Sequence, residues 1–139
     1  MEGRPTSPSE NRKCRLALRA DTGFGIGSKP GAKVLHIRKP DNHDADGALW
    51  NFPNGVRGTL KLRLMLNAGF GGASISLNDR SFKPTDDNSE RLAVFVARIK
   101  PAGQLAGGPK LSLGQWHTLA FAWDLRAQSC AVSVDGTKP

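Results

Sequence analysis

The stretch that decides the fold runs from residue 59 to residue 66 and reads Thr-Leu-Lys-Leu-Arg-Leu-Met-Leu. Leucine occupies every second position of it, and Lys61 and Arg63 lie between leucines. Because successive side chains of a strand point to opposite faces of a sheet, this alternation predicts a β-strand with one apolar and one cationic face. The strict alternation, and the glycines at 58 and 69, argue against a helix.

The same period of two recurs along most of the chain. Turn-forming clusters of Gly, Asn, Asp and Pro separate the alternating runs. No segment combines a helical period with capping residues. Many short strands joined by turns predict an all-β fold, and we expect an antiparallel β-sandwich. Its further strands are expected at 14–19, 33–38, 73–77, 92–99, 117–123 and 130–134.

The chain has 139 residues, which is enough for one domain with its own core. We expect residues 1–12, rich in Pro, Ser and charge, to be a disordered tail, and residues 13–139 to form a single β-sandwich domain. No stretch is long and apolar enough for a membrane span, and residues 1–5 show no export signal. The Asp135-Gly136 hairpin turn lies three residues from the last residue, so we expect a domain truncated at its C-terminus or completed by a strand of another chain.

Charge and cysteines leave alternatives open. The net charge of +8 favours polyanionic partners, namely acidic glycans, anionic lipid or nucleic acid, although a scattered positive surface also serves solubility. Basic residues are spread along the chain, which argues against a dedicated nucleic-acid arm.

Cys14 and Cys130 each share a strand side with apolar neighbours. They are either buried free thiols or a disulfide between the first and last strands, if those strands are neighbours.

A family resemblance rests on residues 113–119, 123–124 and 130–136, which read Leu-Gly-Gln-Trp-His-Thr-Leu, Trp-Asp and Cys-Ala-Val-Ser-Val-Asp-Gly. The pattern resembles laminin-G-like domains, in which a Gly-containing turn precedes Trp-His and a later strand ends in Val-Asp-Gly. The resemblance implies a concanavalin-A-like jelly roll that binds glycans or proteins and in some members holds calcium. Residues 48–53 and 69–77 are similar to modules of bacterial sialidase-type secreted proteins, which implies an extracellular or cell-surface location within a larger secreted protein.

Groups suited to catalysis are scarce in the sequence. Glycoside hydrolysis needs two carboxyl groups flanking the bond. Of the three glutamates, two lie in the N-terminal tail and Glu90 lies at the edge of a predicted strand, so no pair can be built. The histidines His36, His43 and His117 have no recognisable nucleophile partner, and His117 is expected to be structural. We therefore expect no enzyme activity in this chain.

A metal site is predicted at Asn42, Asp44 and Asp46, which precede Gly47. Oxygen ligands at alternate positions followed by glycine are typical of the opening of a calcium loop, because the turn brings those side chains onto one ion. The closing acid of an EF-hand would fall at Pro53, so that motif is excluded. The alternative is a solvated acidic turn between two strands.

A ligand site is predicted on the polar sides of two strands. His36 and Arg38 lie opposite the apolar positions of the run 33–38, as Lys61 and Arg63 do in theirs. If the two strands share a sheet, the four side chains form a cationic patch, and forked Arg donors suit carboxylates and sulfates. The alternative is an ordinary polar outer face that keeps the sheet soluble.

Tryptophan could add stacking to such a site. Trp50 lies beside the Asp-rich loop, and we assign it to the ligand site. Trp116 and Trp123 lie in a strongly apolar strand, and we expect both in the core. The sequence thus favours a non-catalytic carbohydrate-binding module, with anionic glycans as the preferred ligands. The alternatives are an accessory domain of a glycoside hydrolase and a structural module that accepts a strand; nucleic-acid binding rests on charge alone.

Overall fold

A computed structural model describes residues 13–20, 24–26, 34–37, 46–53, 55–79, 81–83, 86 and 88–137. At 13–20, 24–26, 46 and 53 the description is confined to the backbone. Within these ranges no helix has the length and apolar character needed to cross a membrane. The predicted tail at 1–12 lies outside the described residues.

Antiparallel strands make up most of the described chain, which confirms the all-β prediction. Two short 3-10 turns, η1 (Ser89–Leu92) and η2 (Pro101–Gly103), accompany them. The strands are β1 (Lys13–Ala20), β2 (Phe24–Ile26), β3 (Leu35–Ile37), β4 (Asp46–Pro53), β5 (Arg57–Leu66), β6 (Ala73–Asn78), β7 (Phe95–Ile99), β8 (Trp116–Asp124) and β9 (Ser129–Val134).

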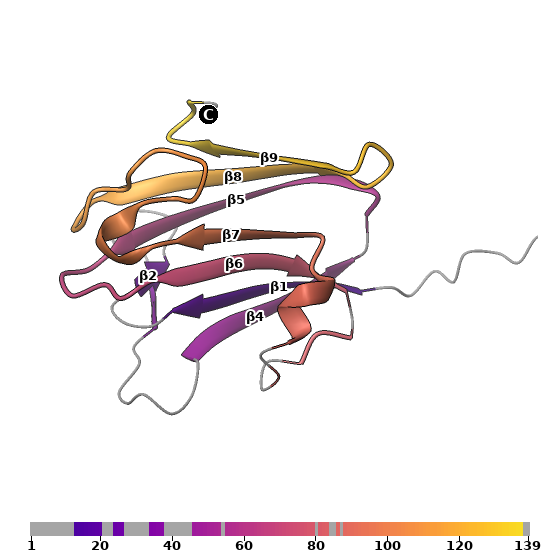
Figure 1. Cartoon of the computed structure of the whole chain (residues 1–139), viewed down its shortest axis with the longest axis horizontal. Coiled ribbons are helices and arrows are strands. Elements are labelled where there is room, and N and C mark those ends of the chain that lie inside the picture. Colours follow the sequence, from indigo (N-terminus) through magenta and orange to yellow (C-terminus); the bar gives the residue numbers. More distant parts are fainter. Residues whose placement is uncertain are drawn as a thin grey trace, which may run out of the picture.

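The strands form two sheets, one in the order β4-β1-β6-β7 and one in the order β3-β2-β5-β8-β9. Within each sheet, every pair of neighbouring strands is antiparallel. Figure 1 shows β9, β8 and β5 along one side of the molecule and β7, β6, β1 and β4 along the other. We call these the five-stranded and the four-stranded sheet.

The two sheets pack on a shared apolar core. Leu64 and Leu66 of β5 are fully buried, and Ile75 of β6 and Ile99 of β7 are buried in the same cluster. Each such side chain stabilises the fold by about 1.5–3 kcal/mol relative to an exposed one. The rings of Phe95 and Phe121 stack across the two sheets with centroids 5.1 Å apart. The leucine alternation that predicted β5 therefore predicts its buried face correctly.

Two expectations about strands are corrected. The predicted strand at 92–99 begins only at Phe95, because Ser89–Leu92 forms η1 and leaves Leu92 exposed. The first and last strands are not neighbours: β1 lies inside the four-stranded sheet and β9 at the edge of the other. Cys130 is a free thiol, so a disulfide to Cys14 is wrong, and partial burial raises the pKa of the Cys130 thiol.

The hairpin turn predicted at Asp135-Gly136 is present. Both residues have positive φ, 50° and 81°, as a two-residue type I′ turn requires. The N–H of Val134 donates to the carbonyl of Thr137 at 3.1 Å, and the N–H of Thr137 donates back to Val134 at 2.9 Å. The turn thus starts a new antiparallel rung beside β9.

Candidate functional site

The outer face of the five-stranded sheet carries the predicted cations. Along β5 the side chains of Arg57, Lys61 and Arg63 alternate with the core-facing leucines, as the burial pattern of this strand shows. Their cross-strand partners on β8 are Asp124, Ala120 and Thr118. Because paired residues of a sheet point to the same side, these β8 side chains share the face.

On this face the guanidinium of Arg63 lies over the ring of Trp116. The guanidinium carbon of Arg63 lies 5.5 Å from the centroid of the Trp116 ring, a cation–π geometry. Trp116 is 37% exposed, so the prediction that it lies in the core is wrong, whereas Trp123 is buried as predicted. The two tryptophans are seven positions apart in one strand, an odd number that places them on opposite faces. That spacing is the signal by which the sequence could have identified Trp116.

His36 lies in β3, which belongs to the same sheet as β5. The predicted cationic patch requires that these two strands share a sheet. It pairs with Gly25 of β2, and Gly25 pairs with Met65 of β5. One strand, β2, therefore lies between His36 and β5, and His36 is on the outer face of the sheet. The side-chain amide of Asn67 donates to Nε2 of His36 at 3.3 Å. Arg38, the fourth member of the predicted patch, lies outside the described residues.

Trp50 is not brought to this face. It lies in β4, at the edge of the four-stranded sheet, and is 68% exposed. By strand alternation it shares a side with Ala48 and Phe52, which pack against the core. The structure therefore separates Trp50 from Lys61 and Arg63, which the sequence had placed in one site.

A lane of small side chains runs beside the cations. On the outer face β8 presents Thr118, Ala120 and Ala122, and β9 presents Ala131 and Ser133, paired with Ala122 and Ala120. Such short side chains let a flat ligand approach the sheet, while the longer side chains of β5 border it. A shallow hollow of about 680 Å³ lies at one end of the lane.

An ion pair closes that end of the lane. Nε of Arg57 lies 2.6 Å from Oδ2 of Asp124. The N–H of Ala127, then that of Arg126 and the guanidinium of Arg57, hold the pKa of the Asp124 carboxyl below its usual range. Arg57 is thereby engaged by a carboxylate of the protein itself.

The predicted calcium loop is not described. Asn42 and Asp44 lie outside the described residues, and Asp46 opens β4 with its backbone alone described. Within the described ranges no three His, Cys, Asp or Glu side chains gather in a way that could hold a metal ion. Calcium binding by this loop stays a prediction.

His117 has the structural position expected for it. Its ring is buried; Nδ1 lies 2.8 Å from Oδ2 of Asp135 and Nε2 lies 3.1 Å from the carbonyl oxygen of Ser112. The other oxygen of Asp135 accepts from the N–H of Thr118 at 2.7 Å. This backbone bond first, and then the bond to His117, lowers the pKa of Asp135. The arrangement fastens the turn after β9 to the start of β8.

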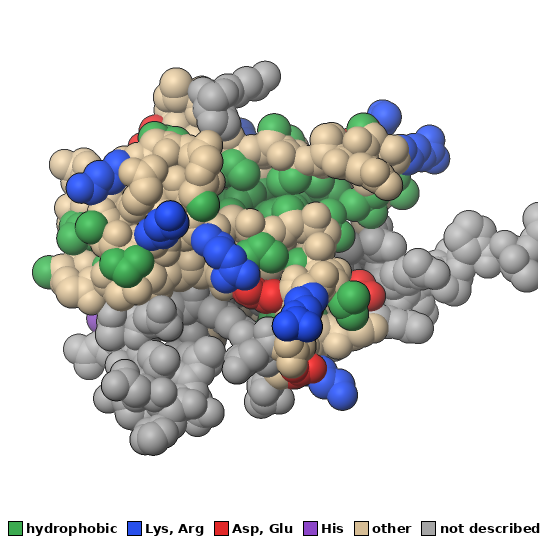
Figure 2. All heavy atoms as spheres, viewed as in Figure 1, with side chains coloured by type: hydrophobic (Ala, Val, Ile, Leu, Met, Phe, Trp, Pro, Cys, Tyr) green, Lys and Arg blue, Asp and Glu red, His purple; other side chains and the backbone are tan. Residues whose placement is uncertain are grey.

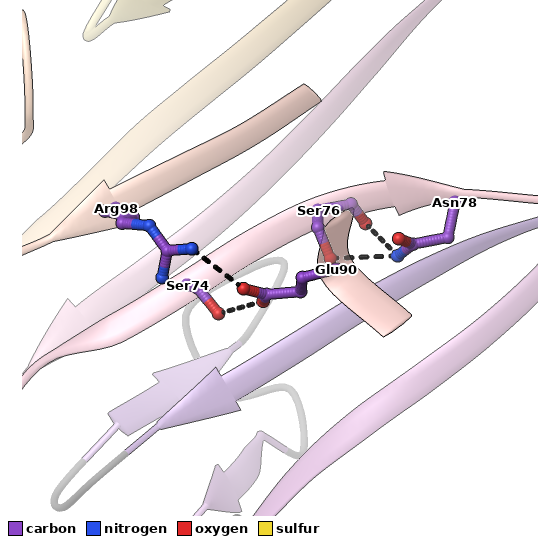
Figure 3. A network of polar contacts seen from close by, with 5 residues as sticks. All are labelled: Ser74, Ser76, Asn78, Glu90 and Arg98. Atoms are coloured by element: carbon purple, nitrogen blue, oxygen red, sulfur yellow. Dashed lines mark hydrogen bonds and ion pairs between the residues drawn. The ribbon is translucent and has the colours of Figure 1, made fainter. Parts of the chain in front are cut away.

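Glu90 is likewise engaged in structural contacts, shown in Figure 3. Its Oε1 accepts from the hydroxyl of Ser74 at 2.6 Å, and its Oε2 accepts from Nη2 of Arg98 at 3.1 Å. These bonds tie η1 to β6 and β7 on the outside of the four-stranded sheet. Nearby, Nδ2 of Asn78 donates to the hydroxyl of Ser76 at 2.9 Å.

Comparisons with known proteins do not place the chain in a family. No protein-family model, curated protein or solved structure matches it.

Proposed function

We propose that the chain is a non-catalytic module that binds anionic carbohydrate on the outer face of its five-stranded sheet. The observation that carries the proposal is the Arg63–Trp116 pair next to Lys61. A sugar that bears a carboxylate or sulfate needs both an apolar surface for its C–H face and donors for its charge. An exposed indole beside a guanidinium and an ammonium provides these together.

The charge balance supports an anionic ligand. The guanidinium of Arg63 offers parallel N–H donors that match the two oxygens of a carboxylate or sulfate. Lys61 is two positions away on the same strand face, about 7 Å along the strand, and adds a second point charge. The overall charge of +8 raises the local concentration of polyanions around this surface.

We also propose that the fold is a jelly roll of the concanavalin-A-like type. The all-β sandwich-like architecture and the motif at 113–136 are consistent with a laminin-G-like, concanavalin-A-like jelly roll. We further propose that the module belongs to a secreted or cell-surface protein, where such glycans are found. Calcium held by Asn42, Asp44 and Asp46 is an additional proposal, which supplies a second route to glycan contact.

The test is a glycan array containing sialylated, sulfated and uronate sugars, with neutral sugars of the same backbone, run with calcium and again with chelator. We expect selective binding of the anionic set. The double variant K61A/R63A should lose it, whereas K83A/K100A, which removes the same charge from exposed positions outside this face, should retain it. A blank array from a demonstrably folded protein, or equal losses in both variants, would overturn the proposal. Loss on chelation would assign calcium to the site.

A further inference from the structure

The lane of small side chains on the outer face of the five-stranded sheet has different groups at its two ends. Trp116, which is 37% exposed, lies at one end, and the Arg57–Asp124 ion pair lies at the other. The nine residues of β8 between these ends, Trp116 to Asp124, span about 27 Å of extended strand. The lane is therefore several times longer than a single sugar ring.

The lane is long in the direction of the strands and narrow across them. Its floor consists of two strands, β8 and β9, which lie about 4.8 Å apart. The long side chains of Lys61 and Arg63 on β5 border the floor on one side. On the other side, β9 is the last strand of this sheet within the described chain. A ligand that uses the whole floor therefore lies parallel to β8.

Uncompensated positive charge lies along one half of the lane. Arg63 lies over the ring of Trp116, and Lys61 is the next residue on the same side of β5. At the other end the charge of Arg57 is balanced by the carboxylate of Asp124, 2.6 Å away. The hollow of about 680 Å³ at that end is also lined by short side chains, two of them hydroxylated, namely Thr59, Ala122, Ser129 and Ala131. One half of the lane thus suits an acidic group, and the other half suits an uncharged, hydroxyl-bearing group.

The net charge of the chain does not by itself mark this lane. Figure 2 shows Lys and Arg side chains spread over the face of the molecule that it presents, with acidic side chains among them. Dispersed charge attracts polyanions but does not align them in one direction. Lys61 and Arg63 differ in that they stand in line beside a floor of small side chains.

We propose that the lane binds a stretch of several units of a linear polysaccharide in which acidic and neutral sugars alternate, with the chain parallel to β8. An acidic unit lies against Lys61 and Arg63, and a neutral unit lies in the hollow beside Arg57 and Asp124. This inference rests on the proposed glycan-binding function and adds to it the direction, the length and the charge pattern of the ligand.

The test is calorimetric titration with size-defined oligosaccharides of alternating uronate and N-acetylhexosamine, from the disaccharide to the octasaccharide. We expect the affinity to rise about tenfold or more along the series and then to level off, because linked units bind together until the lane is filled. A disaccharide that binds as tightly as the octasaccharide would overturn this inference and leave glycan binding by this face intact. Absence of binding by every member would overturn the glycan-binding function as well.

The charge pattern has its own probe, an octasaccharide in which every unit is a uronate. At about 0.15 M salt, where charges more than about 8 Å apart are largely screened, we expect it to bind less tightly than the alternating octasaccharide. The reason is that it places a carboxylate beside Asp124, which then competes for Arg57. Equal or tighter binding of the uniform chain would show that the lane does not select alternation.

Two variants test whether the ligand extends along the lane. A122Y places a ring on the floor of the hollow, at a strand position where aromatic residues are favoured. L92Y is the matched control, since Leu92 is 73% exposed in η1 and lies outside the lane. We expect A122Y to abolish the gain of the octasaccharide over the disaccharide and L92Y to retain it. A gain retained in A122Y would overturn the proposal. If urea denaturation shows that A122Y does not fold, A131Y blocks the same point of the floor from β9.

Discussion

The indole ring of Trp123 lies directly against the backbone of Gly58, its cross-strand partner. A Cβ built at Gly58 would overlap Cζ2 and Cη2 of the ring. The indole N–H donates to the carbonyl of Gly55 at 3.3 Å. The absence of a side chain at position 58 therefore makes room for the largest buried side chain at this end of the core.

The first prediction concerns this contact. We expect G58A to destabilise the fold by about 1–3 kcal/mol, because the ring must shift out of its hydrogen-bonded position or the strands must separate. The measurement is urea denaturation followed by tryptophan fluorescence. T59A, at the neighbouring exposed position, is the control and should cost less than about 1 kcal/mol. A G58A protein as stable as T59A would contradict the packing described.

Much of the five-stranded sheet could be predicted from the sequence. Its central strand β5 has leucine at every second position, so one face is apolar under any arrangement of the neighbours. β8 and β9 alternate in the same way, and the Asp135-Gly136 turn requires the positive φ that this pair readily adopts. Where one face is buried and a turn type is encoded locally, the pattern alone determines the strand.

The missed features depend on contacts that the pattern does not encode. β2 has three residues and β4 contains glycine and ends in proline, so neither looks like a strand without its partner β5 or β1. Trp116 is a different case, because its hydrophobicity favours the core and only its odd spacing from Trp123 indicates the outer face. The separation of Trp50 from Arg63 follows from their sheet assignment, which only the three-dimensional pairing reveals.

The second prediction follows from the lowered pKa of Asp135. Above pH about 4 this carboxyl is ionised in the folded and unfolded states alike, and its bonds to Thr118 and His117 contribute fully. As the pH falls through the lower folded-state pKa, that contribution is lost. D135N should be less stable than the natural chain at pH 7 by about 1 kcal/mol and should lack this part of the acid-dependent loss. The check is denaturant unfolding across pH 2–7; identical curves for the two proteins would contradict it.

The third prediction concerns Glu90, whose side chain is 11% exposed between Ser74 and Arg98. E90Q should cost about 1–2 kcal/mol, because the neutral amide loses the charge-assisted bond to Arg98 and keeps a bond to Ser74 only if that hydroxyl turns from donor to acceptor. R98A removes the more exposed partner and should cost less than about 1 kcal/mol. Thermal unfolding of both variants and of their combination gives the coupling. Strictly additive losses would show that the ion pair in Figure 3 makes no contribution.

The last prediction compares two tryptophans that the sequence does not rank correctly. Trp116 lies beside Arg63 on the cationic outer face, whereas Trp50 lies in the other sheet. If the outer face binds anionic sugar, W116A should weaken that binding about tenfold or more, since it removes the stacking surface and the ring that orients Arg63. W50A removes a more exposed indole, 68% against 37%, and should leave affinity unchanged. Titration calorimetry with a sulfated glycan from the array distinguishes the two. A loss in W50A with W116A unaffected would move the glycan site to β4 and the Asp-rich loop that precedes it.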